Sequence, residues 1–115
     1  MTMMGKQKKA EELIPVSMEI ILHAGNARNI ADDAFKLAKQ QDFDGAAQKM
    51  DEADKEMVLA HNSQTSVIQG EAQGVEYEYS PLFAHAQDTL MTITSELLTT
   101  NKLIDVLKLM LAKKE

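Results

Sequence analysis

Apolar residues recur at steps of three and four along most of the chain, and this spacing places them on one side of an α-helix. The first such stretch runs from about residue 13 to 41 and opens with Pro15, which fits the first turn of a helix. Gly25 costs about 1 kcal/mol relative to alanine inside a helix, so we expect another backbone to approach closely there. The face consists mostly of alanine: Val16, Ile20, Ala24, Ala27, Ala31, Ala34 and Ala38.

A second amphipathic helix is predicted from about residue 45 to 70, after a polar turn. Asp42 or Asp44 can cap it, because a carboxylate accepts hydrogen bonds from the free amides of a helix start. The turn also mimics part of a calcium loop, but Gln40 takes its first position and Asp51 its last, where glutamate is required. Capping is therefore favoured over calcium binding. The apolar row of this helix comprises Ala46, Met50, Ala53, Met57, Ala60, Thr65 and Ile68.

The third predicted helix begins at about Pro81, because Ser80 followed by proline is a strong start signal. Before it, residues 70–80 contain Gly74 and predict the longest and most mobile loop. Two neighbouring rows of the third helix are expected to pack onto the other two helices. They consist of Phe83, Leu90, Leu97, Ile104 and Leu111, and of Ala86, Ile93, Thr100 and Leu107.

The composition agrees with an all-α protein, since aromatic residues make up only 4% and there is no tryptophan. The net charge of −6 disfavours nucleic acid as a partner. The absence of cysteine excludes disulfides and thiolate catalysis and fits the cytoplasm. No apolar run approaches the ~20 residues of a membrane span. We therefore expect a flexible tail over residues 1–12, which includes a small basic cluster without assigned function, and one domain over residues 13–115.

The outer side of the third helix lacks the alternating charges that are usual on a solvated face. Its residues are small and polar, and they permit the close approach of another helix. We therefore hypothesise that this face meets copies of itself in an oligomer. The residues that follow one another on it are Asp88, Thr92, Ser95 and Thr99.

Of the three histidines, only His85 has an acidic neighbour at the third position beyond it, Asp88. A neutral imidazole can attack a phosphoryl group, although a single helical histidine is more often structural. His23 and His61 fit a structural role at packing boundaries. The sequence contains no Glu-x-x-His pairs for a di-metal bundle, no glycine-rich phosphate loop and no serine nucleophile elbow.

The segment 84–91, Ala-His-Ala-Gln-Asp-Thr-Leu-Met, resembles the active-site motif of the lactose/cellobiose class of enzyme IIA from the bacterial sugar phosphotransferase system. The usual motif is His-Ala-Gln-Asp-His-Leu-Met. Residues 20–28 are similar to the signature of the family's first helix, and residues 60–65 with Glu71 and Ala72 to that of its second. Order and spacing agree over residues 14–112.

The resemblance implies an antiparallel three-helix bundle that assembles into a homotrimer around its third helix. His85 would accept a phosphoryl group from the phosphocarrier HPr and pass it to the cognate enzyme IIB, and the membrane component, enzyme IIC, would take up the sugar. Asp88 would lie on the trimer axis and bind one divalent cation per trimer, commonly magnesium, in a structural role. Gln87 would support His85 by hydrogen bonding.

One position departs from the family motif: Thr89 stands where the family has a second histidine. No assisting role of that histidine carries over to this chain. The resemblance leans towards a cellobiose-type disaccharide over lactose or diacetylchitobiose. The alternative that the residues leave open is a non-catalytic oligomeric helical adaptor.

Overall fold

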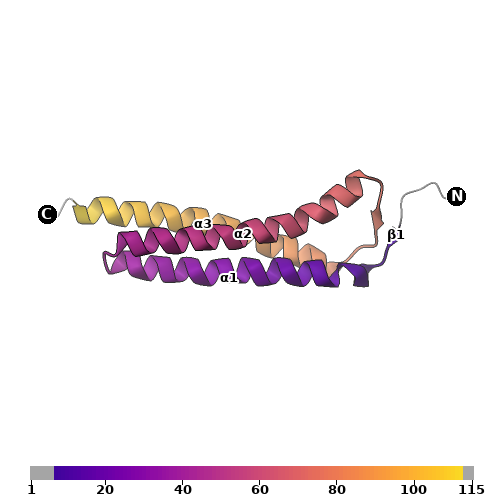
Figure 1. The fold of residues 1–115 in the computed structure, drawn as a ribbon, viewed down its shortest axis with the longest axis horizontal. Coiled ribbons are helices and arrows are strands. Elements are labelled where there is room, and N and C mark those ends of the chain that lie inside the picture. The colour runs from indigo at the N-terminus through magenta and orange to yellow at the C-terminus, as the bar shows by residue number, and fades with distance from the viewer. Residues whose placement is uncertain (1–6, 113–115) are drawn as a thin grey trace.

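The computed structural model describes residues 7–112, apart from the side chain of Gln7. Three long helices lie side by side in a rod of 73 × 20 × 18 Å, and α2 runs back along α1 (Figure 1). The all-α prediction and the three helices are confirmed, with ends close to the expected ones. The elements in order are β1 (Gln7–Lys8), the short 3-10 helix η1 (Ala10–Leu13), α1 (Ile14–Lys39), α2 (Phe43–Ala72), β2 (Glu76–Tyr77) and α3 (Pro81–Ala112).

Side-chain caps start both later helices, as the sequence predicts. The Asp42 carboxylate accepts a hydrogen bond of 2.9 Å from the amide of Gly45 at the start of α2. A Cβ atom at Gly45 would crowd that carboxylate, so a larger residue there would make the Asp42 side chain shift. At the start of α3, the Ser80 hydroxyl accepts a hydrogen bond of 3.1 Å from the amide of Phe83. These bonds satisfy amides that have no partner within the helix.

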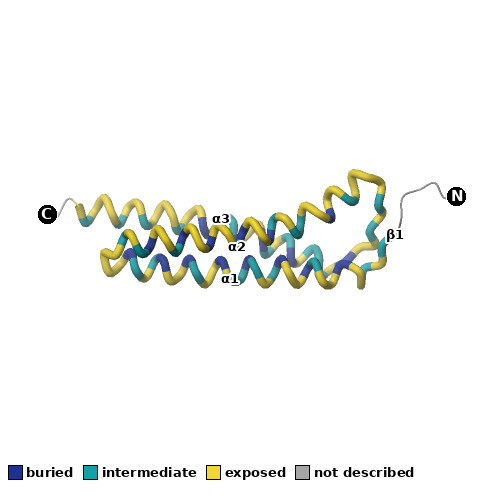
Figure 2. Tube along the Cα trace, viewed as in Figure 1, coloured by how far each residue is buried: buried dark blue, intermediate teal, exposed yellow. Residues whose placement is uncertain are grey.

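The core lies along the alanine face of α1, which contacts both α2 and α3. Buried positions recur along each helix at the predicted spacing (Figure 2). Because alanine side chains are short, the partner helices approach α1 closely and larger residues fill the space from α3. The fully buried positions of the alanine face and of α3 are Ile20, Ala24, Ala27, Ala34, Ala38, Ala86, Leu90 and Ile93.

Two details of the predicted packing are wrong. In α2, Val67 is buried, whereas Thr65 and Ile68 are exposed. The last turns of α2 bend away from α1 (Figure 1), and the buried side of the helix there continues the line from Ala60 to Val67. At Gly25, a Cβ atom would have no neighbouring atom within 4 Å. Within residues 7–112, the space that this Cβ would occupy is open, so no other helix of the chain packs against the glycine there.

The ends of the predicted tail and loop also differ from expectation. All residues from 7 to 12 except Lys9 belong to β1 or η1. The strand β1 pairs in parallel with β2, so that Gln7 lies opposite Glu76 and Lys8 opposite Tyr77. Helix α2 extends to residue 72, which shortens the predicted loop. Hydrogen bonds between the N-terminal segment and the connection from α2 to α3 stabilise both. Sequence periodicity cannot predict this pairing, because the two segments are distant in the sequence. The part of the predicted tail over residues 1–6 lies outside the described residues.

The packing predicts different costs for two leucines. Leu90→Ala removes a side chain with no exposed surface and should lower the free energy of unfolding by about 2–5 kcal/mol, because a cavity remains in the core. Leu22→Ala removes the same atoms from a side chain that is 58% exposed and should cost about 0.5 kcal/mol or less. Urea unfolding of both variants and the parent measures the difference. Equal losses would contradict the assignment of the core.

Candidate functional site

His85 lies in the second turn of α3, and its side chain is exposed. Within residues 7–112, no hydrogen bond or ion pair engages its imidazole. Its backbone carbonyl accepts a hydrogen bond of 2.9 Å from the Thr89 hydroxyl one turn later. Thr89 therefore uses its hydroxyl on the helix backbone. The imidazole is left with both ring nitrogens available to a partner molecule.

The outer face of α3 is exposed in the single chain, as the residue spacing predicts. Asp88, Thr92, Ser95 and Thr99 all face solvent, opposite the core. The last three line a shallow hollow along the helix together with Glu96 and Thr100. No three His, Asp or Glu side chains of residues 7–112 gather closely enough to hold a metal ion.

Gln87 lies on a different side of α3 from His85, because two residues correspond to about 200° around a helix. Its side-chain oxygen accepts a hydrogen bond of 3.3 Å from the amide of Gln64 in α2. The bond leaves the amide hydrogens of Gln87 free to donate. The support of His85 by Gln87 stays a prediction. The hydrogen bond between Gln64 and Gln87 was not predicted from the sequence. Nothing in the spacing of one helix indicates which residue of another will face it.

His23 is bound in a network between α1 and α2 that fits its predicted structural role. Its Nδ1 lies 3.0 Å from the Glu56 carboxylate, and the Asn26 amide donates to the same oxygen at 3.0 Å. The hydrogen bonds from His23 and Asn26 lower the pKa of Glu56 below its usual value. His61 is half-buried in a groove between α2 and α3, beside Asp54. Neither histidine is as accessible as His85.

A bidentate ion pair joins α1 to α3 about three turns beyond His85. The Arg28 guanidinium donates to both oxygens of Glu96, at 2.8 and 2.6 Å. The bonds from Arg28 lower the pKa of Glu96, and the same bonds raise the pKa of Arg28. Sequence spacing gives no sign of this pair, because 68 residues separate its members.

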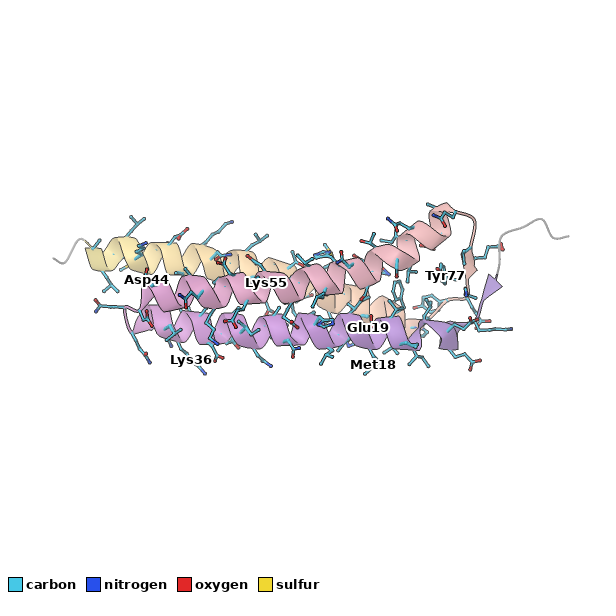
Figure 3. All side chains as sticks on the ribbon, viewed as in Figure 1. Met18, Glu19, Lys36, Asp44, Lys55 and Tyr77 are labelled. Carbon is cyan, nitrogen blue, oxygen red and sulfur yellow. The ribbon has the colours of Figure 1, made fainter. Side chains whose placement is uncertain are left out.

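The same ion pair shows which residues of α1 and α3 lie at the same height along the rod, because the two helices run in the same direction (Figure 1). Eleven residues before Arg28 and Glu96 come residues 17 and 85, so the first turns of α1 are level with His85. On α1, exposed apolar side chains follow one another at four-residue steps: Ile14 at 47%, Met18 at 52% and Leu22 at 58% exposure. Met18 projects outward from the rod (Figure 3). An exposed apolar row of this kind suits contact with another protein.

A family model described as "PTS system, Lactose/Cellobiose specific IIA subunit" matches residues 15–108. The chain belongs to this family. It is 43% identical to the lichenan-specific phosphotransferase enzyme IIA component of Bacillus subtilis over 81 residues, which are 70% of this chain and 74% of that protein. The resemblance inferred from the motif is thereby confirmed.

Solved structures agree with this enzyme IIA in fold. The cellobiose-specific enzyme IIA from Bacillus anthracis superposes with a TM-score of 0.82 at 36% identity, covering 98% of this chain and 95% of that one. The IIA(Chitobiose)–HPr complex of the Escherichia coli phosphotransferase system gives 0.74 at 34% identity, covering 85% and 95%. Enzyme IIA is a phosphotransferase component, and the family has a phosphocarrier role in sugar uptake.

The two remaining signature segments of this enzyme IIA hold its helices together. His23, Asn26 and Arg28 of the first segment bind carboxylates on α2 and α3. Ser63 of the second segment donates to Glu19 at 3.0 Å. No helix among the described residues is both long enough and apolar enough to cross a membrane.

The Arg28–Glu96 pair yields a pH prediction. Glu96→Gln should lower the free energy of unfolding by about 0.5–1 kcal/mol at pH 7, since the pair is nearly half exposed and solvent screens it. A carboxyl with a lowered pKa stabilises the fold above its ordinary value of 4.5 and loses that contribution as the pH falls through its folded pKa. The difference between parent and variant should therefore vanish on acidification below pH 4.5.

The matched control is Glu52→Gln, because Glu52 makes only an exposed contact of 3.5 Å with Lys49 in its own helix. This variant should change stability little at any pH. Thermal unfolding from pH 7 down to acid measures both variants. A Glu96→Gln deficit that stays constant with pH would show that packing, and not charge, causes it.

Proposed function

We propose that this enzyme IIA carries a phosphoryl group on His85, which it accepts from phospho-HPr and delivers to the cognate enzyme IIB. The observation that carries the proposal is the exposed imidazole on the motif that resembles the family's active site, which no hydrogen bond or ion pair within residues 7–112 engages. A nucleophile that must react with two proteins in turn has to be open to both. The complex of the E. coli relative with HPr supports the first partner.

The proposed chemistry consists of two in-line displacements. A ring nitrogen of His85 attacks phosphorus, the bond from phosphorus to the HPr histidine nitrogen breaks, and that imidazole leaves with the electron pair. The nucleophile of enzyme IIB then attacks the same phosphorus and releases the His85 imidazole. Such transfers depend chiefly on alignment and on the exclusion of water. One accessible histidine on a rigid helix is therefore sufficient on this side of the reaction.

The apolar row of α1 supports protein partners for this site. Ile14, Met18 and Leu22 lie about level with His85 along the rod, and a docked protein that reaches around the bundle from α1 to α3 would cover them and the histidine together. Burying such side chains drives association and removes water from the reacting groups. The enzyme IIA would thus use α1 for docking and α3 for chemistry.

We further propose that antiparallel three-helix bundles of this chain form a homotrimer around α3. The outer face of α3 supports this, since its small polar residues allow close approach and its exposure leaves it free in one chain. Three Asp88 carboxylates on the axis would repel one another unless a hard cation balances them. Carboxylate oxygens suit magnesium, which would serve as structural ion, one per trimer.

We propose that the protein works in the cytoplasm and serves the uptake of a cellobiose-type disaccharide. Enzyme IIC, the membrane component that takes up the sugar, would be an indirect partner. The named relatives serve lichenan, cellobiose and diacetylchitobiose systems at similar identity. A carrier that never touches the sugar has no pocket for it, so the preference rests on the resemblance alone.

The phosphoryl acceptor is tested with enzyme I, HPr and labelled phosphoenolpyruvate. The parent should gain an acid-labile phosphate, His85→Ala should gain none, and His61→Ala should label like the parent. A label that persists in His85→Ala would refute the assignment. Absence of label in the parent, with assembly intact, would favour the alternative of a non-catalytic helical adaptor.

The cation site is tested with Asp88→Leu. Removing the carboxylates removes both the ligands and their repulsion, so magnesium binding should be lost while the trimer persists. Calorimetric titration with Mg²⁺ and sedimentation measure the two properties, and Asp105→Leu on the same helix is the control. A variant that still binds one divalent ion per trimer would exclude Asp88 as the ligand.

A further inference from the structure

Beyond the β1–β2 pairing, Glu78 binds the N-terminal segment to the connection between α2 and α3 through both its backbone and its side chain. The amide of Glu78 donates to the carbonyl of Lys8 at 2.8 Å. Its carboxylate accepts a hydrogen bond of 3.0 Å from the amide of Ala10. Glu78 thus holds both ends of the short segment between β1 and η1. We call the segment Lys8–Ala10 with Glu78 the clasp.

The segment of the clasp is fixed on its other side by local contacts. The amide of Lys9 donates to the Glu12 carboxylate at 2.9 Å, and the Lys8 ammonium lies 3.6 Å from the same side chain. Behind it, Leu13 is buried, which ties η1 to the bundle. The backbone that Glu78 binds is therefore anchored to the body of the protein.

From Glu78, a short run of hydrogen bonds leads to His85. Ser80, two residues later, is buried and caps α3 through its hydroxyl. Its carbonyl accepts a hydrogen bond of 3.0 Å from the amide of Ala84, the residue before His85. The direction in which the chain enters Ser80 sets the direction of the first turn of α3. The next turn carries His85.

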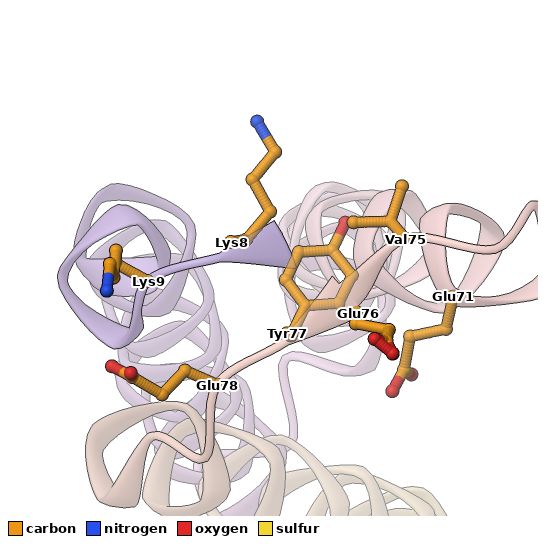
Figure 4. Close-up of a pocket in the computed structure, with 7 residues that line it drawn as sticks. All are labelled: Lys8, Lys9, Glu71, Val75, Glu76, Tyr77 and Glu78. Atoms are coloured by element: carbon orange, nitrogen blue, oxygen red, sulfur yellow. The ribbon is translucent and has the colours of Figure 1, made fainter. Parts of the chain in front are cut away.

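Glu78 differs from the other acidic residues around it. Figure 4 shows the cavity between β1, β2 and the end of α2, in which the Glu78 carboxylate turns towards the segment that carries Lys9. Glu76 turns the other way, towards Glu71 at the end of α2 (Figure 4). Among the described residues, no hydrogen bond or ion pair engages the Glu76 side chain. Among the described residues, the side chain of Glu78 is thus hydrogen-bonded to the N-terminal segment, whereas Glu76 pairs with that segment through its backbone alone.

We propose that Glu78 is a positioning residue for phosphoryl transfer: the clasp fixes the start of α3 and thereby the His85 imidazole. The proposal rests on the proposed function of His85 and extends it to a segment that precedes the family match, which begins at residue 15. Without the bond to Ala10, the connection before Ser80 keeps one fewer tether and the first turn of α3 frays more often. In-line transfer is sensitive to displacements of about 1 Å.

The experiment compares three variants of the full chain. Glu78→Ala removes the acceptor, Glu78→Gln keeps a side-chain oxygen that can still accept from Ala10, and Glu76→Ala removes a neighbouring charge without a bond. Transfer from phospho-HPr to His85 is followed by rapid quench at several HPr concentrations, and hydrogen exchange of the Phe83–His85 amides is measured on the unphosphorylated proteins.

The clasp predicts that Glu78→Ala lowers kcat about threefold to tenfold with little change in KM, because the docking row on α1 is untouched. The same variant should exchange the first-turn amides faster. Glu78→Gln should restore both properties to near the parent level, and Glu76→Ala should resemble the parent in both. This rescue would show that the loss follows the hydrogen bond to Ala10 and not the negative charge of Glu78.

Three results would overturn the clasp: parent-like transfer in Glu78→Ala, a Glu78→Gln variant as slow as Glu78→Ala, or an equal loss in Glu76→Ala. The last two would trace the effect to charge. A parent protein that takes no phosphate on His85 would instead overturn the proposed function, and the transfer role of the clasp with it. Hydrogen exchange, which needs no phosphate, distinguishes these cases.

Discussion

The alanine face of α1 is the constraint on which the rest of the structure depends. Ala24, Ala27, Ala31, Ala34 and Ala38 are all buried, and they let two helices pack closely on one side of α1. Alanine loses no side-chain entropy on folding and favours the helix. Larger side chains of the partner helices, such as Leu90 and Ile93, then supply the apolar area. A bulkier α1 would separate α2 from α3 and disturb every contact between them.

Close packing leaves the polar contacts to the edges of the bundle, and these set the relative heights of the helices. Arg28 joins α1 to α3, and Glu56 with His23 joins α2 to α1. Each pair is partly exposed, so its contribution to stability is modest. Its geometric effect is larger, because a shift of one turn would break both hydrogen bonds of the bidentate pair. Apolar packing holds the helices together, and polar pairs select one register.

Helix periodicity predicts most of the fold because each helix buries a stripe whose spacing is visible in the sequence. The caps at Asp42 and Ser80 could be predicted for the same reason, since they are local. What failed depends on contacts between distant segments. Gly25 was expected to lie against another backbone, but among the described residues no atom comes within 4 Å of a Cβ placed there. The β1–β2 pairing joins segments almost seventy residues apart, and two-residue strands carry no periodicity of their own.

The motif around His85 is informative for a different reason: it contains residues that the core does not need. On α3, Ala86 and Leu90 face inward, whereas Asp88 lies on the opposite side and His85 about 60° from it. Folding alone would tolerate many residue types at both exposed positions. Their identities are therefore free to serve assembly and chemistry, and they point to function more directly than the buried rows. The partners of Gln87 and Glu78 become visible only when the helices and the N-terminal segment are brought together.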